Sequence, residues 1–99
     1  MPAYWIGHVE VTDADAYGKY AELAGPAIAK HGGKFLARAG RYVQFEGNDR
    51  ARNVVVEFPT LEDAVKCYNS PEYTEARSHA EGASVRLSLI HISEPTRPY

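Results

Sequence analysis

Three side chains suited to proton-transfer chemistry interrupt otherwise apolar or small-residue stretches of the sequence: His8, Arg38 and Glu57. A histidine titrates near neutral pH, and with a carboxylate and a guanidinium beside it forms a general acid or base for an anionic or enolisable ligand. In that arrangement Arg38 would bind a ligand carboxylate or enolate, and Glu57 would orient His8. The alternative is an interface network in which these groups satisfy one another, because structural ion pairs gather the same residue types.

Tyrosines form a second group of candidates, because a phenolic hydroxyl at the rim of a pocket orients a ligand oxygen. Tyr17, Tyr20 and Tyr68 lie on the apolar faces of predicted helices, and we regard them as candidate ligand-binding residues. Their alternative role is packing, since large aromatic side chains dominate small hydrophobic cores. Cys67 has no histidine or lysine at an activating spacing, so we expect a buried free thiol.

Composition and motifs exclude several classes of function. The 99-residue chain has 11 Lys and Arg against 13 Asp and Glu, so it has no basic field that would attract nucleic acid or an anionic membrane. There is no CxxC, HExxH or GxGxxG motif, and we expect neither a metal nor a cofactor. A single cysteine, no apolar run of about 20 residues and no basic leader segment predict a cytoplasmic protein.

Alternating apolar and polar residues predict the strands that must position these side chains. The predicted strands cover residues 4–11, 34–46, 53–58 and 84–92, and the second and third are expected to form a hairpin. Strict alternation along the first strand places His8 on the face opposite Trp5. Along the second strand it places Arg38 on the same face as Leu36 and opposite Phe35.

Two helical regions connect the predicted strands. The first helix is expected to begin within the stretch Thr12-Asp13-Ala14-Asp15 and to stop at Gly32-Gly33. Pro26 predicts a kink or restart within it. The second region begins after the capping residue Thr60 and restarts at Ser70, which precedes a proline at the first helical position. The order of elements is therefore strand, helix, strand, strand, helix, strand.

That order predicts a ferredoxin-like α+β fold, a four-stranded antiparallel sheet in the order 4-1-3-2 with both helices on one face. The opposite, bare face would carry the three proton-transfer candidates on adjacent strands. It would also carry Ile6, Leu36 and Val55, which a monomer would expose to water. We therefore expect a homodimer in which two bare faces pack together and enclose the polar residues.

Four segments occur here in an order and spacing found in a known family: EVTD at 10–13, IAKHGG at 28–33, VVVEFP at 54–59 and YNSPEY at 68–73. The pattern spans residues 3 to about 87 and resembles the domain-of-unknown-function 1330 (DUF1330) family. The resemblance implies a dimeric α+β barrel, whose two sheets pack around an interior that related families use for ligands or chemistry. It implies no particular activity.

The C-terminal segment departs from that family, whose final strand is normally followed by Glu-Gly. From Leu87 the sequence reads LSLIHISEPTR, which looks like the translation of a sequencing-library adapter. We therefore divide the chain into a domain, residues 1–87, and a tail of non-native origin, residues 88–99. The alternating part of this tail is still expected to pair as a strand.

Three classes of function remain open. They are a dimer that binds a small molecule, a cofactor-independent enzyme of the monooxygenase or isomerase kind, and a non-catalytic interaction module. The enzyme rests on architectural analogy with other dimeric α+β barrels. A cavity of roughly several hundred cubic ångströms lined by His8 and Arg38 would disfavour the interaction module, whereas a filled interior would disfavour the other two.

Overall fold

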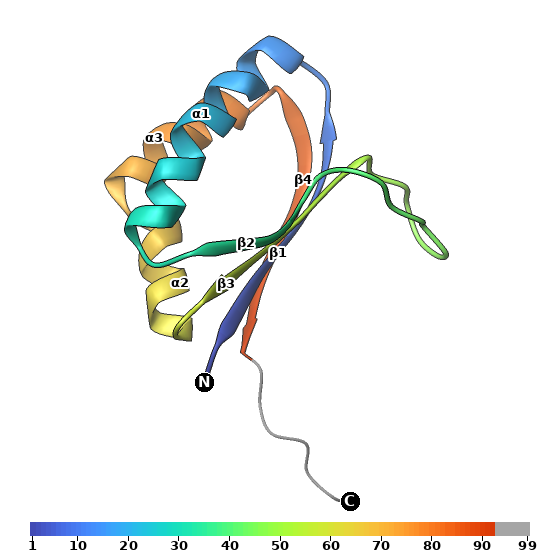
Figure 1. Ribbon diagram of the computed structural model, residues 1–99. Helices are drawn as coiled ribbons and strands as arrows, with labels where there is room; N and C mark the ends of the chain where they lie inside the picture. Colours follow the sequence, from blue (N-terminus) through green and yellow to red (C-terminus); the bar gives the residue numbers. More distant parts are fainter. Residues whose placement is uncertain (93–99) are drawn as a thin grey trace, which may run out of the picture.

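A computed structural model describes residues 1–92 of the chain. Its elements are, in order, β1 (Ala3–Val11), α1 (Ala14–Lys30), β2 (Lys34–Arg38), β3 (Arg52–Phe58), α2 (Leu61–Tyr68), α3 (Pro71–Ala80) and β4 (Ser84–Ile92). The strands form one antiparallel sheet in the order β2-β3-β1-β4, and the helices cover one of its faces (Figure 1). The predicted ferredoxin-like fold and strand order are confirmed.

Helix α1 begins where the sequence predicts. The Asp13 side chain accepts a hydrogen bond from the amide of Ala16 at 3.2 Å and satisfies one of the free amides of the first turn. Of the kink or restart predicted at Pro26, the restart is wrong, because α1 continues through this residue to Lys30, and the kink stays a prediction. Pro26 lies on the exposed side of the helix, where water replaces the hydrogen bond that proline cannot donate.

The second helical region consists of two short helices, as predicted. Thr60 caps α2 by accepting from the amide of Asp63 at 3.0 Å. Ser70 joins the two helices, since its buried hydroxyl donates to the carbonyl of Cys67 at 2.7 Å and accepts from the amide of Tyr73 at 3.2 Å. One side chain therefore ends α2 and begins α3.

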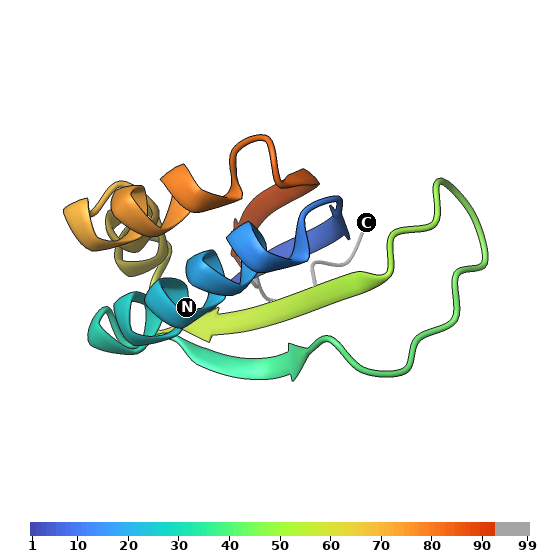
Figure 2. The ribbon, with the colours of Figure 1, turned by 90° about the horizontal axis from the view of Figure 1, so that it is seen from above.

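Strand β2 is shorter than the sequence pattern predicts. It ends at Arg38, and the predicted continuation to residue 46 is wrong. Ala39 and Gly40 have φ angles of 59° and 92°, in the left-handed region that a strand does not use. Residues 39–51 instead form a long loop that projects from one end of the sheet (Figure 2).

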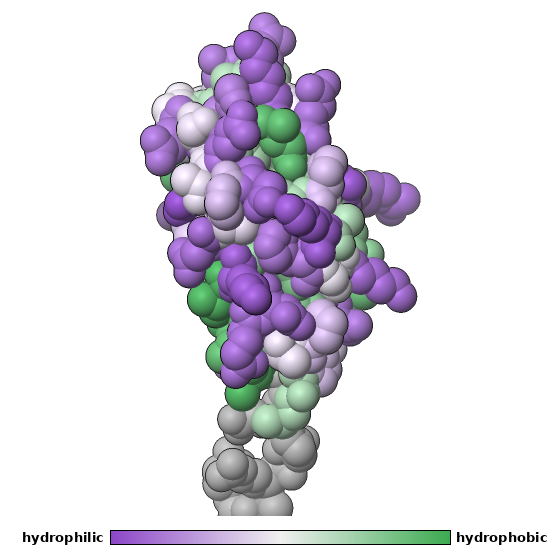
Figure 3. All heavy atoms as spheres, turned by 90° about the vertical axis from the view of Figure 1, so that its left-hand side faces the viewer, coloured by the Kyte–Doolittle hydropathy of each residue, from purple (hydrophilic) through white to green (hydrophobic). Residues whose placement is uncertain are grey.

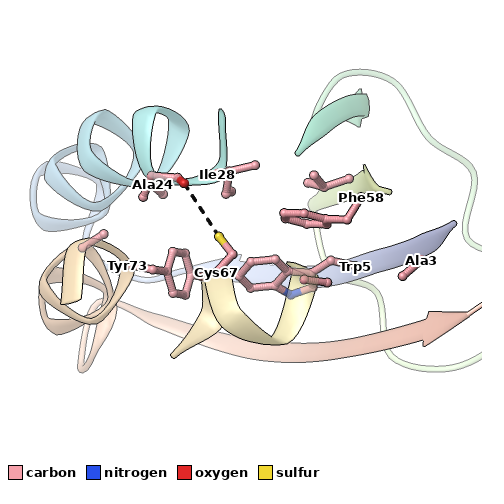
Figure 4. Packing of buried hydrophobic residues seen from close by; sticks show 11 residues of the cluster. Ala3, Trp5, Ala24, Ile28, Phe58, Cys67 and Tyr73 are labelled. Carbon is pink, nitrogen blue, oxygen red and sulfur yellow. Dashed lines mark hydrogen bonds between the residues drawn. The ribbon is translucent and has the colours of Figure 1, made fainter. Parts of the chain in front are cut away.

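The hydrophobic core lies between the helices and the covered face of the sheet. Its largest members are Trp5, Phe58 and Tyr73, which pack around the buried Cys67 (Figure 4). The outer surface of the helical layer is mostly hydrophilic (Figure 3). Within residues 1–92, no helix combines the length and apolar character needed to cross a bilayer.

Strand β4 pairs with β1 along its whole length, from Ser84 opposite Val11 to Ile92 opposite Ala3. The expected pairing of residues 88–92 is therefore confirmed. Residues 93–99, the remainder of the predicted tail, lie outside the described part of the chain. The non-native origin of the tail stays a prediction.

Candidate functional site

A cavity of about 60 Å³ lies between the covered face of the sheet and α1. Small residues create it. Gly7 stands between Trp5 and Val9 on the covered face of the central strand β1, and Ala24 and Gly25 of α1 also line the space. A Cβ added at Gly7 would have no atom closer than 4.0 Å. The missing side chain therefore leaves an opening in an otherwise packed layer.

Three arginines from three strands line this cavity: Arg38 of β2, Arg52 of β3 and Arg86 of β4. The sheet register explains why they converge. Arg52 and Arg86 are both paired with Val9 of β1, one from each side, and Arg38 is paired with Val54 of β3. All of these positions face the helices, because the paired residues of neighbouring strands share a face.

Each guanidinium lies over an aromatic ring. The distances from the guanidinium carbon to the ring centre are 4.2 Å for Arg38 over Phe35, 5.4 Å for Arg52 over Tyr17 and 4.8 Å for Arg86 over Tyr20. Such stacking positions a guanidinium while leaving its N–H groups free to donate. The Nε atom of Arg52 is buried and has no hydrogen-bond partner among residues 1–92.

The cavity has an excess of positive charge. None of its lining residues is an aspartate or a glutamate, and none of the three arginines forms an ion pair within the described part of the chain. Burial alone would lower the pKa of Arg86, but the neighbouring tyrosines outweigh it and the pKa is raised. Residues 1–92 contain no cluster of three His, Cys, Asp or Glu side chains arranged to hold a metal ion.

The guanidinium of Arg86 is hydrogen-bonded to the hydroxyl of Tyr73, which is in turn hydrogen-bonded to the hydroxyl of Tyr20. Arg86 Nη2 donates to Tyr73 Oη at 3.2 Å, and Tyr73 Oη lies 2.7 Å from Tyr20 Oη. Burial, and then the proximity of Tyr20, raise the pKa of Tyr73 far above its ordinary value. Burial also raises the pKa of Tyr17. Tyr17 and Tyr73 therefore stay protonated at physiological pH.

The structure separates the tyrosines expected to bind a ligand into two groups. Tyr17 and Tyr20 line the cavity, whereas Tyr68 does not. The Tyr68 hydroxyl instead accepts a hydrogen bond from Arg77 Nη1 at 2.6 Å, and the Tyr68 ring packs edge-on against Trp5 at 5.6 Å. Packing, the alternative role considered for these residues, describes Tyr68.

The predicted face of Arg38 is wrong. Phe35 is paired with Val56 but Ala37 is paired with Val55, so β2 contains one extra residue, Leu36, as a β-bulge. The bulge breaks the two-residue alternation and turns Arg38 towards the helices. Arg38 Nη2 would lie only 3.2 Å from a Cβ added at Gly25 of α1.

His8 and Glu57 do lie on the bare face, but at different places. His8 is paired with Asn53, and His8 Nδ1 lies 2.7 Å from Asn53 Oδ1. Glu57 is paired with Tyr4, four residues further along β3, which corresponds to roughly 13 Å along the strand. The structure therefore does not bring His8, Arg38 and Glu57 together within one subunit, and their catalytic roles stay predictions.

Sequence reasoning missed Arg52, Arg86 and Tyr73. The signal for Arg52 was its place in the alternation Arg52, Val54, Val56, which puts it on the face of the core residues. A charged residue on the covered face is unexpected from sequence, although a long arginine side chain can reach from that face to a cavity. No sequence pattern indicated that Tyr73 would meet Tyr20.

Three solved structures have the same fold. A protein of unknown function from Rhodopseudomonas palustris has a TM-score of 0.76 at 21% identity and covers 98% of this chain and 84% of its own. SnoaB, a cofactor-independent oxygenase from Streptomyces nogalater, has a TM-score of 0.67 at 9% identity, with 99% and 98% covered. A dimeric protein of unknown function with a ferredoxin-like fold from Bacteroides fragilis has a TM-score of 0.64 at 15% identity, with 91% and 94% covered.

Sequence comparison is more specific than these structural likenesses, which at such identities show the fold alone. No protein with a curated description matches the chain. The model of a domain of unknown function, DUF1330, matches residues 2–93 and therefore includes every strand and helix described above. The chain belongs to the DUF1330 family.

Proposed function

We propose that the protein is a homodimer that binds a small organic anion in the cavity between sheet and helices of each subunit. The observation that carries this proposal is the convergence of Arg38, Arg52 and Arg86 on a cavity without an acidic residue. Guanidinium groups donate in a planar fork that matches a carboxylate or an enolate oxygen pair. The aromatic rings beneath them favour a ligand with an apolar body.

The three arginines give the cavity a positive charge that no acidic lining residue balances. Arg52 and Arg86 are partly buried, whereas Arg38 is exposed, and like charges that are partly removed from water repel one another more strongly than they do at a surface. An anion in the cavity would balance these charges. A purely structural role for the partly buried Arg52 and Arg86 would favour carboxylate partners, and neither forms an ion pair within residues 1–92.

The dimer is supported by the bare face of the sheet, which the helices leave uncovered (Figure 1). Ile6 and Val55 are paired at its centre, and the exposed Val85 lies on the same face of β4. The Bacteroides fragilis protein of the same fold is dimeric. In the dimer, His8 and Glu57 would lie at the interface between the sheets, where His8 already contacts Asn53.

Filling the cavity tests the binding site directly. Gly7→Ala adds one methyl group with no atom closer than 4.0 Å, so the fold accepts it while the cavity loses space. Thermal unfolding and calorimetry with acetate, benzoate and phosphate should show stabilisation of the wild type by at least one anion and a loss of at least tenfold in its affinity in Gly7→Ala. Gly18→Ala is the matched control, because Gly18 is exposed on α1 with nothing within 4 Å.

Two results would overturn the proposed site. If none of the three anions stabilises the wild type at millimolar concentration, the cavity does not bind anions. If Gly7→Ala binds as tightly as Gly18→Ala, the ligand binds elsewhere. Neither outcome would depend on the oligomeric state, which light scattering measures separately.

A cofactor-independent oxygenase is the second candidate, favoured by the similarity of fold to SnoaB. The cavity offers the groups that such chemistry needs, because guanidinium and phenol donors stabilise the anion of a quinol before it gives electrons to oxygen. An oxygen electrode measures the consumption of oxygen with a naphthoquinol. A rate no greater than in buffer would leave the binding function and exclude the oxidation of this substrate.

A further inference from the structure

The hydroxyl of Tyr20 ends a chain of hydrogen bonds whose direction is determined by its first member. Arg86 Nη2 lies 3.2 Å from Tyr73 Oη, and Tyr73 Oη lies 2.7 Å from Tyr20 Oη. A guanidinium has only N–H donors, so Tyr73 must accept from Arg86. All three residues line the cavity.

The second step of the chain follows from burial. Tyr73 is fully buried, and a buried O–H without an acceptor is costly. The acceptor that the described residues offer it is Tyr20 Oη, so Tyr73 donates to Tyr20. The Tyr20 proton is then not used in this chain, and Tyr20 is left as a donor in the half-exposed wall of the cavity. Donation from Arg86 to Tyr73 polarises the next bond and strengthens the donor at the end.

We propose that the ligand is a small aromatic carboxylate, one oxygen of which accepts a hydrogen bond from Tyr20 while the other accepts from the guanidinium of Arg52. This inference rests on the proposed anion-binding cavity and adds the class of its ligand. Tyr20 would be a binding residue in direct contact with the carboxylate, and Tyr73 a positioning residue that determines the direction in which Tyr20 donates.

The dimensions and walls of the cavity favour this class. About 60 Å³ is room for a few water molecules, each of which needs roughly 10–15 Å³ on this scale, and therefore for the charged end of a ligand. A cavity that binds benzene measures ~150 Å³, so the ring of the ligand would lie where the cavity opens, beside the half-exposed Phe35 and the exposed Arg38. A carboxylate matches two separate N–H and O–H donors with its two oxygens.

Calorimetry with benzoate, benzamide and acetate tests the ligand class. Benzamide has the same shape as benzoate without the charge, and acetate has the charge without the ring. We expect the wild type to bind benzoate at least tenfold more tightly than either. Tight benzamide binding would overturn the requirement for an anion, and equal affinity for acetate and benzoate would overturn the requirement for a ring.

Tyr20→Phe tests the donor. Benzoate affinity should fall by roughly tenfold or more, since hydrogen bonds to charged groups are the strong ones, while benzamide affinity changes less. The ratio of the two affinities should therefore fall, which a merely structural effect would not cause. Tyr20→Phe also leaves the Tyr73 hydroxyl without its acceptor, so the double variant Tyr20→Phe/Tyr73→Phe provides a form with no stranded donor. An unchanged ratio in both variants would overturn the role of Tyr20.

The outcomes separate this inference from the function on which it rests. If phosphate or acetate stabilises the wild type and not Gly7→Ala, but benzoate does not bind, the cavity binds anions and the aromatic class is wrong. If no anion binds, both proposals fail. If benzoate binds and Gly7→Ala loses it while Tyr20→Phe keeps it, the ligand class stands and the donor is wrong.

Discussion

Arg52 shows how a single residue can serve a site at a cost to the fold. Its guanidinium lies 5.4 Å from the centre of the Tyr17 ring, and its buried Nε–H has no acceptor among the described residues. Burying a donor without a partner costs about 1–3 kcal/mol. An apolar residue at this position would avoid that cost, and the proposed binding function would explain why the strand carries an arginine instead.

Replacement of Arg52 should therefore stabilise the empty protein. Arg52→Met keeps an unbranched side chain over Tyr17 and removes both the unsatisfied donor and one of three like charges. We expect the free energy of unfolding without ligand to rise by about 1 kcal/mol, and anion affinity to fall at least tenfold. Urea denaturation and calorimetry measure the two effects. Arg41→Met, in the exposed loop, is the control and should change neither. A less stable Arg52→Met protein would show that Arg52 is structural.

Cys67 should make stability depend on pH in the alkaline range. Burial, and then the nearby Glu72 carboxylate, raise the pKa of its thiol to about 11, whereas a thiol in an unfolded chain titrates near ~8.5. The contribution of Cys67 is fully present below the unfolded pKa. It is lost as pH rises towards the folded pKa, because the unfolded state releases its proton first.

The measurement is urea denaturation between pH 7 and pH 10, about the limit above which tyrosines also titrate. Cys67→Ala should be less stable throughout, since a buried side chain is shortened, but its stability should decline less over this range. Parallel curves for the wild type and Cys67→Ala would contradict the prediction.

At the scale of elements, Ser70 caps two helices with one side chain. Its one hydroxyl donates to the last turn of α2 and accepts from the first turn of α3, so the two short helices depend on it for their angle. Helices of this length are marginal alone and are held by capping and packing. Tyr73, three residues further on, is thereby directed into the core and towards Tyr20.

Ser70→Ala should lower the free energy of unfolding by about 1–2 kcal/mol. The buried hydroxyl accepts from the amide of Tyr73 and donates to the carbonyl of Cys67, and both hydrogen bonds are lost. Thr60→Ala removes a cap that is only partly buried and makes one bond, so we expect a smaller loss. Chemical denaturation of the two variants provides the comparison. Equal losses would mean that burial and the second bond at Ser70 add nothing.

At the scale of the whole molecule, the two faces of the sheet have different surroundings: the helices pack on one and leave the other bare (Figure 1). The covered face carries the core and the cavity, and the bare face carries Ile6 and Val55 at its centre. The outer side of the helical layer is hydrophilic (Figure 3), which leaves the bare face as the apolar surface for a second copy of the chain. Pairing two such faces would complete the dimeric barrel.

Ile6→Glu should convert the dimer to a monomer, because two carboxylates would be buried near the symmetry axis. Val65→Glu makes a similar change at an exposed position of α2 and should leave the dimer intact. Light scattering at micromolar concentration distinguishes the two states. A wild-type protein that is monomeric at that concentration, with a melting temperature independent of concentration, would refute the dimeric barrel.

The sequence by itself determined the order of elements, the strand order and the family. Two kinds of local signal agreed with the structure: period-two alternation in residues 4–11, 53–58 and 84–92, and helix starts at residues 12–15, Thr60 and Ser70. Local signals failed where a backbone conformation was not encoded in hydrophobicity. The left-handed Ala39 ended β2 eight residues before the alternation did.

Only the tertiary structure decided where the candidate site lies. One extra residue in β2 reverses every side chain beyond it, and that bulge exists only in the register of β2 against β3. The cavity likewise depends on Gly7 of β1 facing Ala24 and Gly25 of α1, a contact between elements far apart in sequence. The convergence of Arg38, Arg52 and Arg86 needed both facts, since the distances between charges depend on how strands pair and which face they share.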